Sequence, residues 1–357
     1  MTNEFGGFKM KTIAKMTIKF SLVFSIMAPA YLFSQGQTFG SGITPPDFER
    51  IGQAGWQFLK LPGNARFAAT GGIISALGRG DASHSFGNPA SVSDAENISV
   101  SANMITWFAD IKYQTVALTK TSGRYSYGFH MIALNYGDML RTENQAILSA
   151  EGINTGKVNV VTAGLGNFTA NDMALGGTFA MKVTDRLQFG VNLRSLSQKI
   201  DDMSVKGYGL DVGTVYYTAF AYNLRICAVG RNFGPNAQYE DNVGWVSSSI
   251  RMPINFTFGV AADLIGADGS GPSILTVAAE FVHPNDGPEK LNFGAEYGFN
   301  KMLFLRGGYR SGYDEQGLTF GGGLSYSLSN MTVNIDYAYL DYGRLGNTSV
   351  MSIGLGF

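Results

Sequence analysis

Histidines, cysteines and clustered carboxylates are the usual sources of catalytic or metal chemistry, and this chain offers few of them. His84, His130 and His283 are the only histidines, and no two of them stand at a spacing typical of metal ligands. A Ser/His/Asp set can be picked out of any chain of this length, because such a triad is defined by geometry and not by sequence position. The sequence therefore predicts no catalytic site, no metal site and no cofactor, and we expect a protein that is not an enzyme.

Glycine-rich stretches could instead bind phosphate. Gly207 and Gly209 lie inside a segment that alternates like a strand, whereas a phosphate-binding loop precedes a helix. We interpret them as positions where the sheet bends or another backbone approaches closely. Cys227 is the only cysteine, so the chain has no internal disulfide, and no cysteine follows the N-terminal leader as a lipid anchor would require.

The composition indicates what kind of element must carry any function. Only 15% of the 357 residues are charged, whereas 47 are Gly, 25 are Phe and 17 are Tyr. Soluble domains usually contain about 25% charged residues and about 7% Gly. The bias is typical of strands with lipid on one side and a crowded interior on the other. The net charge of −1 gives no electrostatic reason to bind nucleic acid.

Residues 1–34 have the features of a cleaved signal peptide. Four lysines between positions 9 and 19 precede an apolar run from Phe20 to Phe33, and the small residue Ser34 stands at a plausible cleavage position. The run is too short to span a bilayer as a helix. The alternative is a retained membrane anchor. We expect an exported protein of the bacterial outer membrane, in contact with its lipid.

Residues 35–96 lack strand alternation and predict an N-terminal hatch segment. The stretch around Gly71 and Gly72 is small and apolar, which suggests short helical turns packed tightly. Asn88 and Pro89 predict a turn that seats the hatch against a wall, because Pro after Asn favours turn initiation. We therefore expect these four residues to have structural roles in the hatch.

From residue 97 to 357 the hydrophobic period is two, which predicts an all-β domain. Ile335 and Tyr337, for example, alternate with Asn334 and Asp336. The pattern gives about 14 strands, an even number, with short turns on one side and longer, more polar loops on the other, as in a transmembrane antiparallel β-barrel. Residues 198–204 count among the longer loops. The alternating segment 158–165 is expected to be a hairpin arm outside the barrel.

The phase of the alternation also predicts which side chains face the lumen and which face lipid. The last strand ends on Phe357, similar to the signal that barrel-insertion machinery reads. Aromatic residues near strand ends suit interfacial girdles: Trp107, Tyr136, Tyr216, Tyr217, Tyr309 and Tyr342. Charged residues of both signs fall on the lumen phase: Arg194, Asp211, Arg225, Glu280, Glu296, Arg306, Arg310 and Asp336.

The longer loops are candidate partner surfaces, because loops carry function more often than strands. Residues 233–252 form one such loop, and we expect Tyr239, Asn242 and Trp245 within it to contact a protein partner.

Several motifs resemble the PorV/PorQ family. Residues 57–72 (QFLKLPGNARFAATGG), followed by Asp81 and by Asn88-Pro89-Ala90, are similar to its opening. Residues 168–175, and residues 182–187 with Gly190, look like its central hairpin. Further similarity lies at residues 306–310, 321–323 and 336–339. The resemblance covers nearly all of the chain after the leader.

The resemblance implies a FadL-like barrel with a plugged lumen and a non-catalytic role in type IX secretion. Such a barrel would bind the C-terminal domains of secreted cargo, or anchor a subunit of the surface attachment complex, with the translocon and a sortase as further partners. A passive FadL-like transporter of hydrophobic compounds across the outer membrane is the alternative.

Overall fold

The computed structural model describes Gly52 and residues 54–148, 154–161, 164–241, 243–244, 246–247, 249–267 and 271–357. The expected signal peptide lies outside these residues, as do Asn242 and Trp245 of the expected partner loop. Within the described residues, no helix is long and apolar enough to cross a bilayer.

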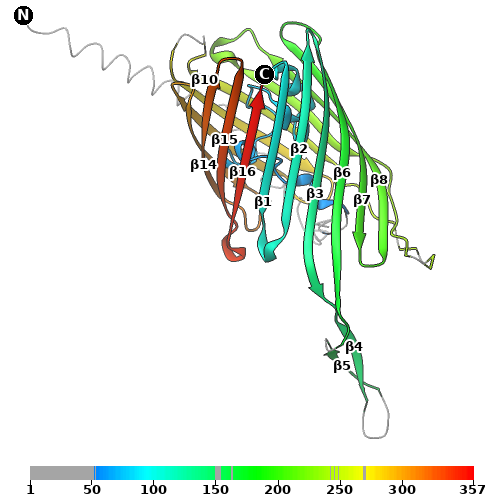
Figure 1. Ribbon diagram of the computed structural model, residues 1–357. Coiled ribbons are helices and arrows are strands. Elements are labelled where there is room, and N and C mark those ends of the chain that lie inside the picture. Colours follow the sequence, from blue (N-terminus) through cyan, green and yellow to red (C-terminus); the bar gives the residue numbers. More distant parts are fainter. Residues whose placement is uncertain are drawn as a thin grey trace, which may run out of the picture. The chain divides into compact units, whose positions relative to one another are not determined.

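Fourteen strands of the described chain close into one antiparallel barrel, which confirms the expected fold class (Figure 1). The barrel closes where the first strand pairs with the last, from Ser99 opposite Gly356 to Thr106 opposite Ser349. The barrel strands are β1 (Ile98–Thr106), β2 (Lys112–Ser122), β3 (Tyr125–Leu140), β6 (Asn167–Lys182), β7 (Leu187–Ile200), β8 (Met203–Tyr217), β9 (Arg225–Phe233), β10 (Asn255–Ile265), β11 (Ile274–Pro284), β12 (Lys290–Phe299), β13 (Leu303–Ser311), β14 (Leu318–Leu328), β15 (Met331–Asp341) and β16 (Asn347–Gly356).

The remaining two strands form a separate hairpin. β4 (Glu143–Leu148) pairs with β5 (Asn154–Val161), and the hairpin projects past the barrel from the ends of β3 and β6 (Figure 1). The alternating segment near residue 158 is therefore an arm outside the barrel, as its sequence predicted.

The two ends of the barrel differ. At the end that carries Phe357, tight turns such as Gly123 join the strands, and we call it the short-turn end (Figure 1). The opposite, long-loop end carries the β4–β5 hairpin and residues 234–254. One expected longer loop, residues 198–204, is wrong. Its residues stay in the β7–β8 ladder until Ile200 pairs with Met203, because Asp201 takes the left-handed backbone (φ 57°) that a two-residue turn requires.

The alternation has the expected phase on the barrel wall. On β15, Ile335 is 49% exposed, whereas Ala338 is fully buried. On β16, Met351 and Ile353 face outward and Val350 faces the interior. The eight charged residues expected on the lumen phase all lie on the inner face, seven of them buried and Asp336 nearly so.

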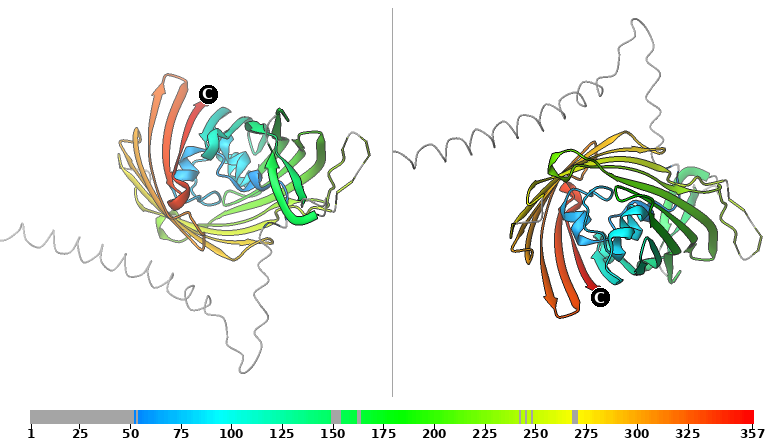
Figure 2. Two further views of the ribbon diagram at one scale, coloured as in Figure 1. Left: turned by 90° about the horizontal axis from the view of Figure 1, so that it is seen from below. Right: turned by 90° about the horizontal axis from the view of Figure 1, so that it is seen from above.

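A plug of short helical turns fills the lumen (Figure 2). Its elements are η1 (Gln57–Lys60), α2 (Ala65–Ala69), η2 (Ala82–Phe86) and η3 (Pro89–Asp94). Three further turns belong to the strand connections: η4 (Phe108–Asp110), η5 (Ala221–Asn223) and η6 (Gly343–Leu345). The described chain starts at the long-loop end, where the Gly55 N–H donates to the Arg251 carbonyl (2.9 Å), and reaches β1 at the short-turn end.

Side-chain caps explain why such short turns form. Asn64 accepts from the Phe67 N–H (2.8 Å) at the start of α2, Asp81 accepts from the Ser83 N–H (2.9 Å) at the start of η2, and Asn88 accepts from the Ala90 N–H (3.0 Å) at the start of η3. Each cap satisfies a backbone donor that a first helical turn leaves free.

The barrel phase predicts an asymmetric response on β15. Ile335→Arg places a charge on the outward apolar face and should lower the stability of the barrel by about 2–4 kcal/mol if the residue lies near the bilayer midplane. Asn334→Arg places the same charge beside a lumen cavity and should cost far less. The folded fraction after refolding into liposomes, read from heat-modifiable migration in gels, measures both. Equal losses would show that the phase is wrong.

Candidate functional site

Side chains of the barrel wall satisfy the backbone of the plug. The carbonyl of Ser85 accepts from Asn192 (2.9 Å) and from Arg194 (3.2 Å), and the carbonyl of Phe86 accepts from Arg231 (3.1 Å). A buried carbonyl without a donor would cost about 1–3 kcal/mol. The lumen-facing cations therefore hold the plug in place.

A carboxylate performs the complementary task on β11. Oε1 of Glu280 accepts from the Ile74 N–H (2.9 Å), from the Ser75 N–H (2.5 Å) and from the Ser75 hydroxyl. Close by, Nε of Arg225 donates to the Ala76 carbonyl (3.1 Å). Wall side chains therefore bond to both the N–H groups and the carbonyl groups of the plug segment that begins at Ile74.

A buried ion-pair cluster holds the plug from the neighbouring strand β12, nearer the short-turn end. Glu296 on β12 accepts from Nε and Nη2 of Arg66 (2.9 and 3.1 Å), from Nε of Arg306 (2.6 Å) and from Arg79. Arg306 also donates to Asp336 (2.6 Å). Loss of the Glu296 carboxylate would leave buried guanidinium groups underpaired, a change that typically costs about 3–5 kcal/mol.

Asn88 and Pro89 lie where the plug meets the wall. The Asn88 amide donates to the carbonyls of Ser75 (3.1 Å) and Thr214 (3.2 Å), and so joins the plug to β8. Pro89 packs on a wall glycine, Gly190, where an added Cβ would come within 2.4 Å of the plug backbone.

Gly71 and Gly72 lie where the plug meets β12 to β14. Both adopt left-handed backbone, with φ of 75° and 78°. The Gly71 N–H donates to the Thr319 hydroxyl (3.0 Å), and a Cβ on Gly71 would come 2.5 Å from the Phe293 carbonyl oxygen. Only glycine meets both the dihedral angle and the contact.

The described part of the expected partner loop folds onto the barrel. The Tyr239 hydroxyl donates to Gln198 on β7, and its N–H donates to the Ser247 hydroxyl (2.9 Å). Tyr239 is therefore held against the wall, and it is not among the residues that line the pocket described next.

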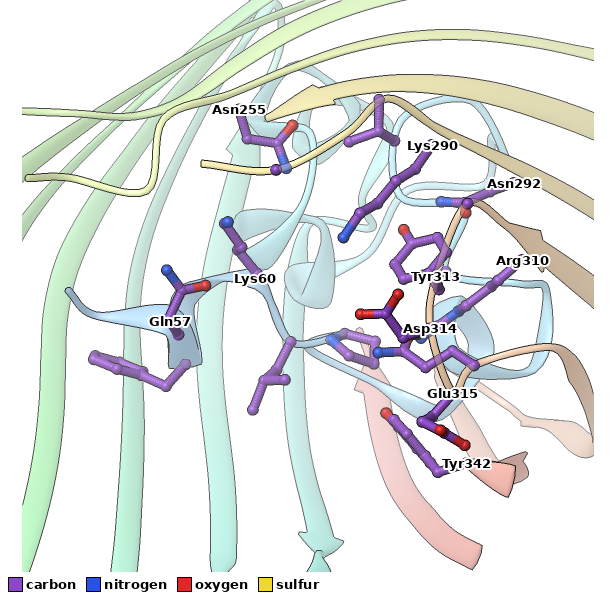
Figure 3. Close-up of a pocket in the computed structure, with 18 of the residues that line it drawn as sticks. Gln57, Lys60, Asn255, Lys290, Asn292, Arg310, Tyr313, Asp314, Glu315 and Tyr342 are labelled. Atoms are coloured by element: carbon purple, nitrogen blue, oxygen red, sulfur yellow. Dashed lines mark hydrogen bonds between the residues drawn. The ribbon is translucent and has the colours of Figure 1, made fainter. Parts of the chain in front are cut away.

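A pocket of about 750 Å³ opens between the plug and the long loops, and we call it the mouth pocket (Figure 3). One side is apolar and aromatic. The residues on this side are Phe58, Leu61, Trp107, Phe108, Ile111, Leu134, Tyr136, Tyr342 and Leu345. Phe108 packs edge-to-face on Tyr342 (centroids 5.0 Å apart) and Trp107 on Phe108 (5.6 Å), so η4 and η6 build one rigid wall.

The other side of the mouth pocket is charged. The cations Lys60, Arg231, Lys290 and Arg310 line it together with the carboxylates Glu280, Asp286, Asp314 and Glu315. Lys60 pairs with Asp286, yet burial lowers the pKa of Lys60 below its ordinary value. Lys290 lies over the ring of Tyr313, 4.3 Å from its centroid. Figure 3 shows Lys60, Lys290 and Tyr313 pointing into a common space.

The pocket corrects part of the expected aromatic girdle. Trp107 lines the pocket, as do Tyr136 and Tyr342, the last only 4% exposed, and Tyr217 turns inward to donate to Asp94 (2.6 Å). Trp107, Tyr217 and Tyr342 lie at or beyond strand ends, and Tyr136 lies at a register shift within β3, where the period of two no longer fixes the direction of a side chain. Tyr309 and Tyr216 do lie outside, as expected.

Sequence reasoning did not find the mouth pocket, because its lining comes from the plug and from four separated connections. Its clearest signal in the sequence was the aromatic pair Trp107-Phe108 in a connection between strands. Among the described residues, no group of three or more His, Cys, Asp or Glu side chains is placed to hold a metal ion.

A family described as an uncharacterised protein family (UPF0164) matches residues 44–252, more than half of the 357 residues. The chain belongs to this family. No curated protein sequence matches the chain significantly. The UPF0164 match is compatible with the PorV/PorQ resemblance without establishing it.

Solved structures show the fold class of this UPF0164 member. The Ralstonia pickettii toluene transporter TbuX is similar with a TM-score of 0.52 and 15% identity, covering 82% of this chain and 96% of that one. The Pseudomonas putida toluene transporter TodX gives 0.52 and 13%, covering 83% and 98%. A FadL homologue of Pseudomonas aeruginosa gives 0.47 and 11%, covering 82% and 97%. TbuX and TodX therefore share the barrel fold of this chain.

The contact between plug and wall predicts a strict size limit at Gly190. Gly190→Val should push the plug backbone away and destabilise the protein by about 1–3 kcal/mol, as overpacking does. Gly177→Val is the matched control, because a Cβ there meets nothing closer than 3.9 Å. Thermal unfolding and proteolysis of the plug measure the difference. A Gly190 variant as stable as the control would contradict the contact.

Proposed function

We propose that this protein takes up a small hydrophobic or amphipathic compound across the bacterial outer membrane, and that the mouth pocket is where the compound first binds. The observation that carries the proposal is the pocket itself, a concave site at the long-loop end with one aromatic wall. Ligand pockets are typically concave, mostly apolar and about 300–1,000 Å³ in volume.

The apolar wall supplies the driving force for binding. Burial of apolar surface contributes about 25 cal/mol per Å². Because Trp107, Phe108 and Tyr342 contact one another, a ligand meets an ordered wall and little side-chain entropy is lost on binding.

The charged side of the pocket indicates what kind of head group the ligand has. Of the carboxylates that line the pocket, Asp286 pairs with Lys60, Glu315 pairs with Arg344, and Glu280 bonds to the plug. Among the described residues Arg231, Lys290 and Arg310 have no ion pair, so a carboxylate or similar anionic head group would find cationic partners there. The pocket therefore favours an apolar body with an acidic head over a neutral hydrocarbon.

Similarity of fold adds support of a coarser kind. TbuX and TodX are toluene transporters, and this chain covers most of their length. Neither comparison reaches the level of identity at which a ligand could be transferred, so the ligand class proposed here depends on the pocket.

Charge at the pocket should separate anionic from neutral ligands. Lys290→Gln should weaken binding of laurate about tenfold, the effect of one charge-assisted hydrogen bond. Binding of toluene should stay unchanged. Lys199→Gln, on the exposed outer face of β7, is the control. Isothermal titration calorimetry of the wild-type barrel and of both variants in amphipol measures the affinities for laurate and for toluene. An equal loss for both ligands would argue against an anionic head group.

A second candidate is the secretion role that the PorV/PorQ resemblance implies. Two observations favour it: the β4–β5 hairpin extends past the barrel rim, where a protein could bind it, and the ion pairs of the plug keep the lumen filled (Figure 1). The partners would be a type IX translocon, a sortase or attachment-complex subunit, or cargo C-terminal domains.

Deletion of the gene separates the two candidates. Under the uptake proposal, the deletion strain should accumulate less laurate while its proteins with type IX C-terminal domains reach the surface normally. Removal of residues 143–161 should then leave uptake intact. Retained or uncleaved cargo with normal uptake, reproduced by the hairpin deletion in a folded barrel, would favour secretion instead.

A further inference from the structure

The plug segment Gly72–Arg79 separates two cavities, and we call it the partition. Gly72 and Ile74 line the mouth pocket. Leu77 and Arg79 line a second cavity of about 320 Å³, the inner cavity. The long-loop side and the short-turn side of the lumen are thus divided by a strip of eight residues.

The barrel wall beside the partition also places few side chains between the two cavities. On β10, Thr257 lines the mouth pocket and Asp263 lines the inner cavity. On β11, Glu280 and Thr276 lie on the same two cavities, and the small residue Ala278 is the one inward-facing position between them. One layer of small side chains is therefore all that the wall contributes to the barrier here.

We propose that the partition is the gate of this barrel, that Glu280 is its latch, and that the ligand passes along β9 to β11 from the mouth pocket to the inner cavity. The proposal rests on the uptake function proposed above. It adds the route and the residue that controls it.

The backbone of the partition depends on the latch. Gly72, Gly78 and Arg79 have left-handed backbone, with φ of 78°, 67° and 51°, so the segment is not a helix or strand that holds its own shape. Glu280 accepts three hydrogen bonds from Ile74 and Ser75. Release of this one carboxylate frees the start of the partition from the wall.

A second lumen carboxylate, Glu296 on β12, also contacts the plug, but not at the start of the partition. Glu296 binds Arg306 on β13 and Arg66 at the start of α2, and Arg66 donates in turn to the carbonyls of Gly78 and Arg79 (3.0 and 3.2 Å) at the far end of the partition. The Arg79 side chain also bonds to Glu296. That side chain is 40% exposed, and Glu296 keeps its other two cations without it. Glu296 therefore acts on the far end of the partition through arginines, whereas Glu280 bonds directly to its start at Ile74 and Ser75.

The chain contains its own reporter of gate opening. Cys227, the only cysteine, is buried on β9 in one apolar cluster with Ala76 of the partition and with Ala261 and Ala278 of the wall. A water-soluble methanethiosulfonate reagent reaches this thiol only when the partition moves.

The test compares matched variants of the full-length barrel in detergent without ligand. Glu280→Gln should raise the rate of Cys227 labelling about tenfold, as expected for the loss of a charge-assisted hydrogen bond. Ser75→Ala, which removes one bond to the latch, should raise it less. Asp336→Asn, at a lumen carboxylate that pairs with Arg306 and not with the partition, should leave the rate unchanged, and Cys227→Ser gives the background. Equal rates in the Glu280 and Asp336 variants would overturn the proposal.

Laurate added to the wild-type barrel separates this proposal from the uptake function. Both predict binding by calorimetry, and the gate predicts faster labelling of Cys227 as well. Binding without faster labelling overturns the gate and leaves the uptake function standing. If laurate does not bind but the Glu280 variant still opens selectively, the uptake function fails and the gate is supported.

Discussion

The structure depends on one constraint: a plug with little regular structure lies inside a closed barrel, where much of its backbone is buried and needs hydrogen-bond partners from the protein. Wall side chains meet that constraint. Arginines donate to plug carbonyls, as Arg231 does to Phe86, and carboxylates accept from plug N–H groups, as Glu280 does from Ser75. Buried charged side chains of the wall therefore serve as hydrogen-bond partners of the plug.

The same constraint explains the glycines. Where the plug backbone touches the wall there is no space for a Cβ, so glycines stand on both surfaces. A Cβ on Gly308 of the wall would lie 2.1 Å from the Gly71 nitrogen of the plug. Polar side chains carry the hydrogen bonds and glycines allow the approach that makes them possible, so neither group could be replaced independently of the other.

The strands were predictable from the sequence because the alternation of side chains shows which face of each strand is apolar. That pattern located fourteen strands, the outward face of Ile335 and the inward face of Glu280. It failed at Asp201, where a charged pair looked like a loop but forms a tight turn. It also failed for Tyr342, which lies beyond the end of β15, where period no longer sets direction.

The candidate site was much less predictable. Lys60 and Asp286 lie 226 residues apart and meet only because the plug returns to the mouth of the barrel. Nothing local in either segment marks the pair, and the same is true of Arg66 and Glu296. Sequence patterns report on neighbours along a strand or helix, whereas this pocket is made of contacts between the plug and distant loops.

The hydrogen bond from the Ala65 N–H to the Ser352 hydroxyl joins residues 287 apart (2.7 Å). Ala65 lies in the plug, which precedes the first barrel strand in the sequence, and Ser352 lies on β16, the last barrel strand. Contacts of such sequence separation slow folding, since a long stretch of chain must be ordered before they form. The plug therefore stays incompletely bonded until the final strand arrives. Pairing of β16 with β1 closes the barrel and also completes the hydrogen bonds of the plug. An assembly intermediate without β16 would therefore have an open barrel and an incompletely bonded plug at the same place.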